Sequence, residues 1–266
     1  MNILDEIIAH KKGEVAERKS LTAVSVLEKS DLFGRKTVSL RESLLNPEKS
    51  GIIAEHKRKS PSKGIINQQV SVEQVTTGYT QGGASALSVL TDQKYFDGTD
   101  EHLLRARKAN PDTPILRKDF VIDEYQLIEA KSLGADIILL IAANLTPNQC
   151  KQLAKAAKAL TLEVLLEVHN LEELESSVNE YIDVIGVNNR DLKRMKTDIN
   201  ISKELSERIP GEFLKISESG IHLPEVLQDL RHNYGYNGFL IGEYFMQHSD
   251  PGVAFSNFVA DIKQMA

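Results

Sequence analysis

Residues 114–142 read PILRKDFVIDEYQLIEAKSLGADIILLIA. Two short apolar runs, at 114–120 and 135–142, flank an amphipathic stretch that begins at Asp123 and ends at Gly134. An aspartate before a helix and a glycine after it are ordinary helix boundaries. The stretch therefore predicts a strand, a helix and a second strand, the unit of a parallel sheet that is buried on both faces.

The same unit recurs along the chain. Eight units in about 215 residues predict a closed (β/α)8 TIM barrel. The alternative is an open doubly wound sheet, which usually has fewer strands, and no GxGxxG or GxxxxGK[ST] phosphate loop follows any run. We expect one domain over 1–266, with an N-terminal helical extension over 1–50 and the barrel over 51–266. The eight predicted strands are 51–55, 86–90, 114–120, 135–142, 162–168, 183–188, 213–219 and 238–243.

Composition excludes several classes of protein. The net charge of −6 argues against broad attraction to nucleic acid or to an anionic membrane. The one cysteine, Cys150, cannot build a disulfide framework, and we expect it to be a buried helical residue. The amino-terminal segment has no long apolar core, and the longest apolar run, 137–143, is too short to span a bilayer. We therefore expect a cytoplasmic protein with no membrane or nucleic-acid partner.

Polar side chains follow most of the predicted strands at their carboxyl ends, where a barrel builds its active site. Alternation along the first strand places Glu55 and Lys57 on one face and His56 on the other. Charges buried without a partner are costly, so we expect those of strands one, three and five to converge on one cavity. The nominated strand-end residues are Glu55, Lys57, Lys118, Phe120, Glu167, Asn188, Arg190, Glu218, Ser219, Gly220, Gly242 and Glu243.

Other polar residues nearby have ordinary explanations. A single charge at a strand end is usually solvated, and we expect this of Arg58, Lys59 and Lys63. We expect His56 and His169 to be surface or interface histidines with satisfied hydrogen bonds.

A phosphate site is predicted after the last two strands. Gly220 and Gly242 let backbone N–H groups approach an anion, and these loops hold the phosphate in many barrels. Lys57, Ser60 and Arg190 add donors. With two lysines, two glutamates and no metal-ligand cluster at the strand ends, the residues predict acid/base chemistry on a singly phosphorylated small molecule, without metal or cofactor.

The stretch IIAEHKRKSPSKGII at 52–66 resembles the signature of the indole-3-glycerol phosphate synthase family. The resemblance continues through TDQKYFDG, PILRKDFVIDEYQ, GADIILLI, LEVLLEVHN, IGVNNRDLK, ISESGI and FLIGEYFM, over essentially the whole chain. It implies an enzyme of tryptophan biosynthesis that closes the indole ring of 1-(2-carboxyphenylamino)-1-deoxyribulose 5-phosphate and releases carbon dioxide and water.

The resemblance also implies roles for individual residues. Lys118 would be the general acid, and Glu167, with Glu55 and Lys57, would serve the later dehydration. Asn188 and Glu218 would hold substrate hydroxyls or the intermediate. Phe96 and Phe120 would line the pocket for the aromatic ring. The phosphate would be surrounded by Lys57, Ser60, Arg190, Ser219, Gly220, Gly242 and Glu243.

Four further expectations accompany these roles. A nearby cation, Lys57 or Arg117, and partial desolvation would lower the pKa of Lys118 towards neutrality. Some family members have serine at the position of Glu243, so this carboxylate would point away from a phosphate. The N-terminal helices would pack over the barrel mouth, and the protein would be a monomer or a weak homo-oligomer.

Two other functions remain open at this point. A phosphoribosylanthranilate isomerase would need a Cys/Asp pair at strand ends, but Cys150 lies in a helical stretch. A nucleic-acid-binding module would use the basic stretch 57–63, but it would need interleaved aromatic residues and a wider basic face.

Overall fold

The computed structural model describes residues 3–191 and 196–265. Its centre is a closed barrel of eight parallel strands in which the first strand pairs with the last, Ile53 beside Leu240. The prediction of a (β/α)8 barrel is confirmed, and each predicted run supplies one strand. In chain order the strands are β1 (Ile52–His56), β4 (Ala86–Leu90), β5 (Ile115–Lys118), β6 (Ile137–Ile141), β7 (Glu163–Val168), β8 (Val184–Asn188), β11 (Leu214–Glu218) and β12 (Gly238–Ile241).

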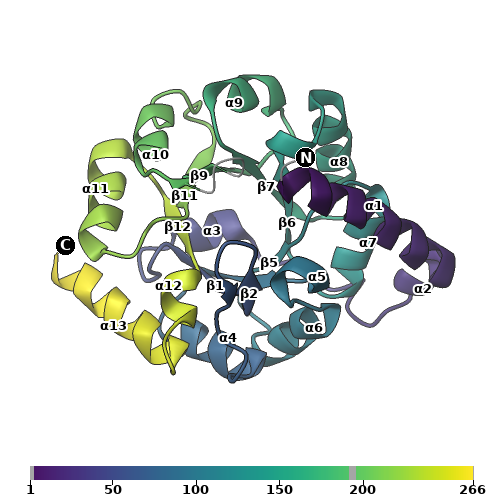
Figure 1. Cartoon of the computed structure of the whole chain (residues 1–266), viewed down its shortest axis with the longest axis horizontal. Helices are drawn as coiled ribbons and strands as arrows, with labels where there is room; N and C mark the ends of the chain where they lie inside the picture. Colours follow the sequence, from purple (N-terminus) through teal and green to yellow (C-terminus); the bar gives the residue numbers. More distant parts are fainter. Residues whose placement is uncertain (1–2, 192–195, 266) are drawn as a thin grey trace.

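Helices surround the barrel, as Figure 1 shows. Many of them begin at a side-chain cap, and Thr146 and Gln149 form a reciprocal capping box before Pro147. The helices after the strands are α4 (Val72–Gln81), α5 (Gln93–Phe96), α6 (Asp100–Ala109), α7 (Glu124–Ser132), η1 (Ala142–Asn144), α8 (Pro147–Ala159), α9 (Leu171–Ser177), α10 (Asn200–Leu205), α11 (Pro224–Tyr234), α12 (Glu243–Met246) and α13 (Pro251–Gln264).

Two small hairpins in the loops are additions that the sequence did not predict. The strands β2 (Lys59–Ser60) and β3 (Gly64–Ile65) pair antiparallel in the loop after β1. The strands β9 (Arg190–Asp191) and β10 (Lys196–Thr197) pair in the loop after β8. Two-residue strands carry no hydrophobic alternation, so the sequence gives no periodic signal for them.

The N-terminal extension covers both ends of the barrel. It contains α1 (Ile3–Leu21), α2 (Val24–Leu27) and α3 (Leu40–Leu45). Leu4 and Ile7 of α1 belong to the apolar cluster inside the barrel, together with Leu40 and Leu44 of α3. The expectation that these helices pack over the mouth is right for α1. It is wrong for α3, whose Leu40 N–H donates to Glu163 at the start of β7 and which lies in the middle of the ring in Figure 1.

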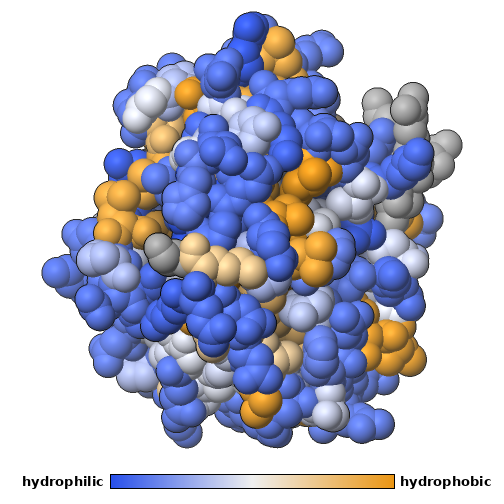
Figure 2. Space-filling view, turned by 90° about the vertical axis from the view of Figure 1, so that its left-hand side faces the viewer, coloured by the Kyte–Doolittle hydropathy of each residue, from blue (hydrophilic) through white to orange (hydrophobic). Residues whose placement is uncertain are grey.

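The surface shows no broad apolar face over the last helices. Figure 2 shows this side as mostly hydrophilic, with hydrophobic residues in small separate groups. Within residues 3–191 and 196–265, we find no helix with the length and apolar character that crossing a bilayer requires.

A buried aspartate joins the extension to the barrel wall. Asp136, just before β6, is 0% exposed and accepts hydrogen bonds from the backbone N–H of Ile115 and of Val38, both at 2.8 Å. Its carboxylate also forms ion pairs with Arg35, at 2.5 Å, and with the buried Arg107. One carboxylate thus holds together two strands, a helix and the preceding chain.

Replacing Asp136 with alanine should lower the free energy of unfolding by about 3–5 kcal/mol, because it leaves the buried Arg107 charge without a partner. Urea denaturation measures this change. The matched control is Asp261→Ala on an exposed position of α13, which should change stability by less than about 0.5 kcal/mol. Equal effects of the two substitutions would contradict the role of Asp136.

Candidate functional site

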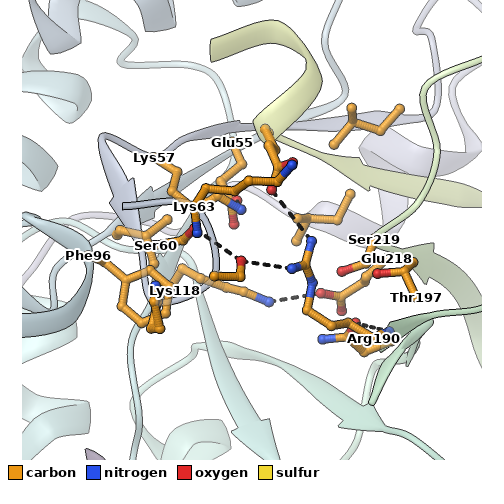
Figure 3. Close-up of a pocket in the computed structure, with 18 of the residues that line it drawn as sticks. Glu55, Lys57, Ser60, Lys63, Phe96, Lys118, Arg190, Thr197, Glu218 and Ser219 are labelled. Carbon is orange, nitrogen blue, oxygen red and sulfur yellow. Dashed lines mark hydrogen bonds and ion pairs between the residues drawn. The ribbon is translucent and has the colours of Figure 1, made fainter. Parts of the chain in front are cut away.

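The carboxyl ends of the strands surround a cavity of about 650 Å³. Figure 3 shows side chains from opposite sides of the barrel pointing into it. All the residues nominated from the sequence line this cavity. They are Glu55, Lys57, Ser60, Phe96, Lys118, Phe120, Glu167, Asn188, Arg190, Glu218, Ser219, Gly220, Gly242 and Glu243.

Lys118 lies between two carboxylates at the floor of the cavity. Its ammonium group donates to Glu218 at 2.8 Å and to Glu167 at 3.0 Å. Burial alone would lower the pKa of Lys118, but the adjacent Glu167 and Glu218 outweigh it and raise the pKa above its usual value. The expectation of a lowered pKa is therefore wrong, because the side chains in contact with Lys118 are carboxyl groups and not cations.

Arg117 does not lower the pKa of Lys118, because its side chain lies on the other face of β5. Alternation turns its side chain away from the cavity, where it is 1% exposed and pairs with Asp100 at 3.2 Å and with Asp119 at 3.4 Å. The Arg117 charge therefore acts on the outer layer of the barrel and not on Lys118 in the cavity.

The two carboxylates that share Lys118 differ in their pKa. Burial raises the pKa of Glu218 to about 7, with a smaller contribution from the adjacent Glu167 and against the pull of Lys118. Burial also opposes ionisation of Glu167, but Lys118 and His169 hold the pKa of Glu167 below its usual value. Like charges at one site commonly separate in this way, so one group stays ionised while the other keeps a proton near neutral pH.

Glu55 and Lys57 form a second ion pair on the same wall, as alternation along β1 predicts. The Lys57 ammonium lies 2.7 Å from Glu55 Oε1, and Ser88 donates to the other oxygen at 3.5 Å. Gly242 faces this pair across the β1–β12 closure, where an added Cβ would lie 2.5 Å from Glu55 Oε1. Glycine is required there for Glu55 to point into the cavity.

Asn188 fixes the orientation of Glu167. Its side-chain amide donates to Glu167 Oε1 at 3.1 Å, and its own oxygen accepts from the Arg190 backbone N–H at 3.0 Å. Glu167 therefore has a hydrogen-bond donor on each oxygen, Asn188 on one and Lys118 on the other.

One end of the cavity gathers cations and hydroxyl groups. Arg190 donates to Ser62 at 2.8 Å, and the Ser60 hydroxyl lies 3.3 Å from that of Ser62. Ser219 (φ 67°) and Gly220 (φ 79°) both adopt the left-handed conformation, so the backbone turns sharply beside them.

One expectation for this end is wrong. Glu243 does not point away, because its carboxylate lies 3.5 Å from Arg190 and 3.5 Å from Lys63. The expectation of a solvated Lys63 is right, because its side chain is 59% exposed, although the residue also lines the cavity. The short β2–β3 hairpin places Lys63 beside the cavity, and the sequence does not predict that hairpin.

The opposite end of the cavity is apolar. The rings of Phe96 and Phe120 lie 6.0 Å apart and are tilted by 38°. Ile3, Leu4 and Ile7 of α1 line the same end, and residue-level analysis of the sequence did not nominate them. Their helical spacing indicates a buried face but does not say what that face contacts.

The expectation of surface or interface histidines with satisfied hydrogen bonds is wrong for His56, which is buried. His56 is 2% exposed on the outer face of β1, and burial lowers the pKa of its imidazole to about 3. His169 lies between Glu167, at 3.4 Å, and Glu173, at 3.1 Å. These two carboxylates raise the pKa of His169 to about 10, although burial opposes the shift.

Cys150 is buried within α8, as expected, and burial raises the pKa of its thiol to about 11. The thiol is therefore not part of the cavity, which argues against the Cys/Asp chemistry of the isomerase alternative. Among residues 3–191 and 196–265, no three His, Cys, Asp or Glu side chains are grouped in a way that could hold a metal ion.

Solved structures share this fold at low sequence identity. 3-Hexulose-6-phosphate synthase from Salmonella typhimurium superposes with a TM-score of 0.61 at 10% identity, over 80% of this chain and 99% of that one. The tryptophan synthase alpha subunit from Legionella pneumophila gives 0.61 at 13% identity, over 85% and 97%. Similarity at this level shows the barrel alone.

Sequence comparison is more specific. The family model for indole-3-glycerol phosphate synthase matches residues 4–258. The indole-3-glycerol phosphate synthase of Bacteroides thetaiotaomicron is 46% identical over 262 residues, 98% of this chain and 99% of its own. That of Salinibacter ruber is 41% identical over 267 residues, 100% of this chain and 98% of its own. The chain therefore belongs to the indole-3-glycerol phosphate synthase family.

Proposed function

We propose that Lys118, Glu167 and Glu218 carry the acid/base chemistry by which this chain closes an indole ring. The reaction is that of the family, a carboxy-lyase step of tryptophan biosynthesis. Its substrate is 1-(2-carboxyphenylamino)-1-deoxyribulose 5-phosphate, and it releases carbon dioxide and water. The observation that carries the proposal is the contact of Lys118 with two buried carboxyl groups between an apolar and a cationic end of one cavity.

In the first half of the reaction a new carbon–carbon bond forms. The ring carbon that bears the carboxylate attacks the ribulose carbonyl, and Lys118 protonates the carbonyl oxygen as it gains negative charge. Loss of carbon dioxide then returns the bonding electrons to the ring. The ionised Glu167 keeps Lys118 in its acid form before the attack, and Glu218, in contact with Lys118 at 2.8 Å, holds a proton that can replace the one transferred.

In the second half the new hydroxyl group leaves as water and one proton leaves the ring system. Glu167 is ionised and oriented by Asn188, so it is the base of this step in our assignment. The Lys57 ammonium, paired with Glu55 at 2.7 Å, is the donor that faces the departing hydroxyl. Asn188 and Glu218 also contact substrate hydroxyl groups in this arrangement.

The ends of the cavity supply the binding energy. Phe96 and Phe120 take the aromatic ring at the apolar end. At the other end, the phosphate binds to Lys57, Ser60, Arg190, Ser219, Gly220 and Gly242, with Glu243 moving off Arg190 as the dianion arrives. The site needs no cofactor in this scheme. A cytoplasmic location stays a prediction, and so does a monomeric or weakly associated state.

Purified protein should convert carboxyphenylamino-deoxyribulose phosphate to a product with indole absorbance, and no product at saturating substrate would refute the proposed reaction.

Lys118→Met should lower kcat by about 10²–10⁴-fold, because it removes the acid. Lys155→Met at an exposed position of α8 is the matched control and should keep full turnover. Near wild-type turnover of Lys118→Met would remove Lys118 from the acid role.

Arg190→Ala should raise KM by roughly 10- to 100-fold with a smaller change in kcat, because a charged hydrogen bond to the phosphate is lost. Steady-state kinetics separate the two constants. Arg208→Ala, on an arginine that pairs with Glu175 at the surface, is the control. An unchanged KM in Arg190→Ala would show that the phosphate binds elsewhere.

Glu218→Gln should remove a loss of stability that the wild type shows as the pH rises towards 7. The folded-state pKa of Glu218, about 7, lies above the unfolded value, so its contribution to stability is full below about pH 4 and is lost as the pH rises towards 7. Glutamine has no such loss, so the stability of the variant relative to wild type should increase between about pH 5 and pH 7.

Urea denaturation over that pH range tests this expectation. Exposed Glu225→Gln should run parallel to wild type and serves as the control. A Glu218→Gln difference that does not change with pH would show that Glu218 is not the group that holds the proton.

A further inference from the structure

Lys11 of α1 is a buried cation that the proposed chemistry does not use. Its side chain is 1% exposed, and its ammonium group lies 2.9 Å from a carboxylate oxygen of each of Glu14, Asp92 and Asp119. Lysine is rarely buried so fully unless it is paired. Asp92 and Asp119 lie in different loops, after β4 and β5, so Lys11 joins two separate parts of the barrel mouth.

Each of these two aspartates also orders the chain that carries one phenylalanine of the cavity. Asp92 caps α5, where it accepts from the Tyr95 backbone N–H at 2.9 Å, and Phe96 is the last residue of that helix. Asp119 accepts from the backbone N–H of Phe120 at 2.8 Å. The aspartates are 0% and 3% exposed, so both carboxylates depend on partners within the protein.

We propose that Lys11 is a positioning residue that sets the separation of Phe96 and Phe120, and through it the affinity of the cavity for an aromatic carboxylate. This inference rests on the proposed function for the placement of the aromatic ring. Without the ammonium group, one of the two buried carboxylates would lose its ion pair and the other would be left with the more distant Arg117, at 3.4 Å, so the loops that carry the phenylalanines would no longer be held together.

The charges around Asp119 agree with this arrangement. Burial would raise the pKa of Asp119, but Lys11 and Arg117 hold it at about 2. Thr91 also donates to Asp119 at 2.7 Å, which fixes the carboxylate from the side of β4. Lys11 lies on α1, outside the barrel loops that carry the two aspartates. Replacing Lys11 therefore tests the position of these loops without changing a residue within them.

The same helix provides a matched control. Arg18, two turns further along α1, pairs with Asp100 at 2.6 Å and with Glu129 at 3.3 Å. It ties α1 to the barrel as Lys11 does, but it contacts neither Asp92 nor Asp119. If both residues only dock α1 on the barrel, the Lys11 and Arg18 variants should bind ligands alike. If Lys11 positions the phenylalanines, only the Lys11 variants should lose affinity.

The test measures binding of anthranilate and of inorganic phosphate by calorimetry in wild type, Lys11→Met and Arg18→Met, with the melting temperature of each. We expect Lys11→Met to raise the dissociation constant of anthranilate about tenfold and to change that of phosphate by less than about twofold. Arg18→Met should lower the melting temperature but leave both dissociation constants unchanged. Because binding needs no turnover, failure of the proposed reaction in wild type would be recognised separately.

A second variant keeps the test valid if Lys11→Met does not fold. Asparagine also caps helices, so Asp92→Asn keeps the start of α5 and removes one charge from the pair with Lys11. We expect Asp92→Asn to raise the dissociation constant of anthranilate about threefold. An unchanged anthranilate constant in the folded Lys11 variant or in Asp92→Asn, an equal loss for phosphate, or an equal loss in Arg18→Met would overturn the proposal.

Discussion

Alternation of side chains in a closed parallel barrel is the constraint on which the site depends. Every second residue points inward, and at the carboxyl ends of the strands these inward residues are Glu55, Lys118, Glu167, Asn188 and Glu218. Charges at this depth are stable only in pairs. The pairing of Lys118 with two carboxyl groups and of Lys57 with Glu55 therefore stabilises these buried charges and brings together the groups of the proposed acid/base chemistry.

The sequence predicts the barrel well because each strand and each helix has its own short-range pattern of apolar and polar residues. A buried parallel strand shows as an apolar run, and its end shows as the first polar residue after it. Glu55, Lys118 and Glu167 could thus be placed at one end of the barrel without knowledge of the distances between strands. That the chain forms one domain stays a prediction.

Properties that depend on distances across the barrel could not be predicted in the same way. The pKa of Lys118 was expected to fall, because Arg117 is adjacent in sequence, whereas Glu218 is 100 residues away and in contact. The position of Lys11 has the same origin, since Asp92 and Asp119 are more than eighty residues away from it in sequence.

The pairing of β1 with β12 has a consequence for the order in which the molecule forms. Ile53 cannot meet its neighbour Leu240 until nearly the whole chain has left the ribosome. Contacts of such long separation are formed late, because the loop between them must be closed first. Glu55 and Gly242 meet only across this seam. An unfinished chain therefore holds many of the strands but not a complete site, and the last strand to be synthesised is the one that brings the site to its working shape.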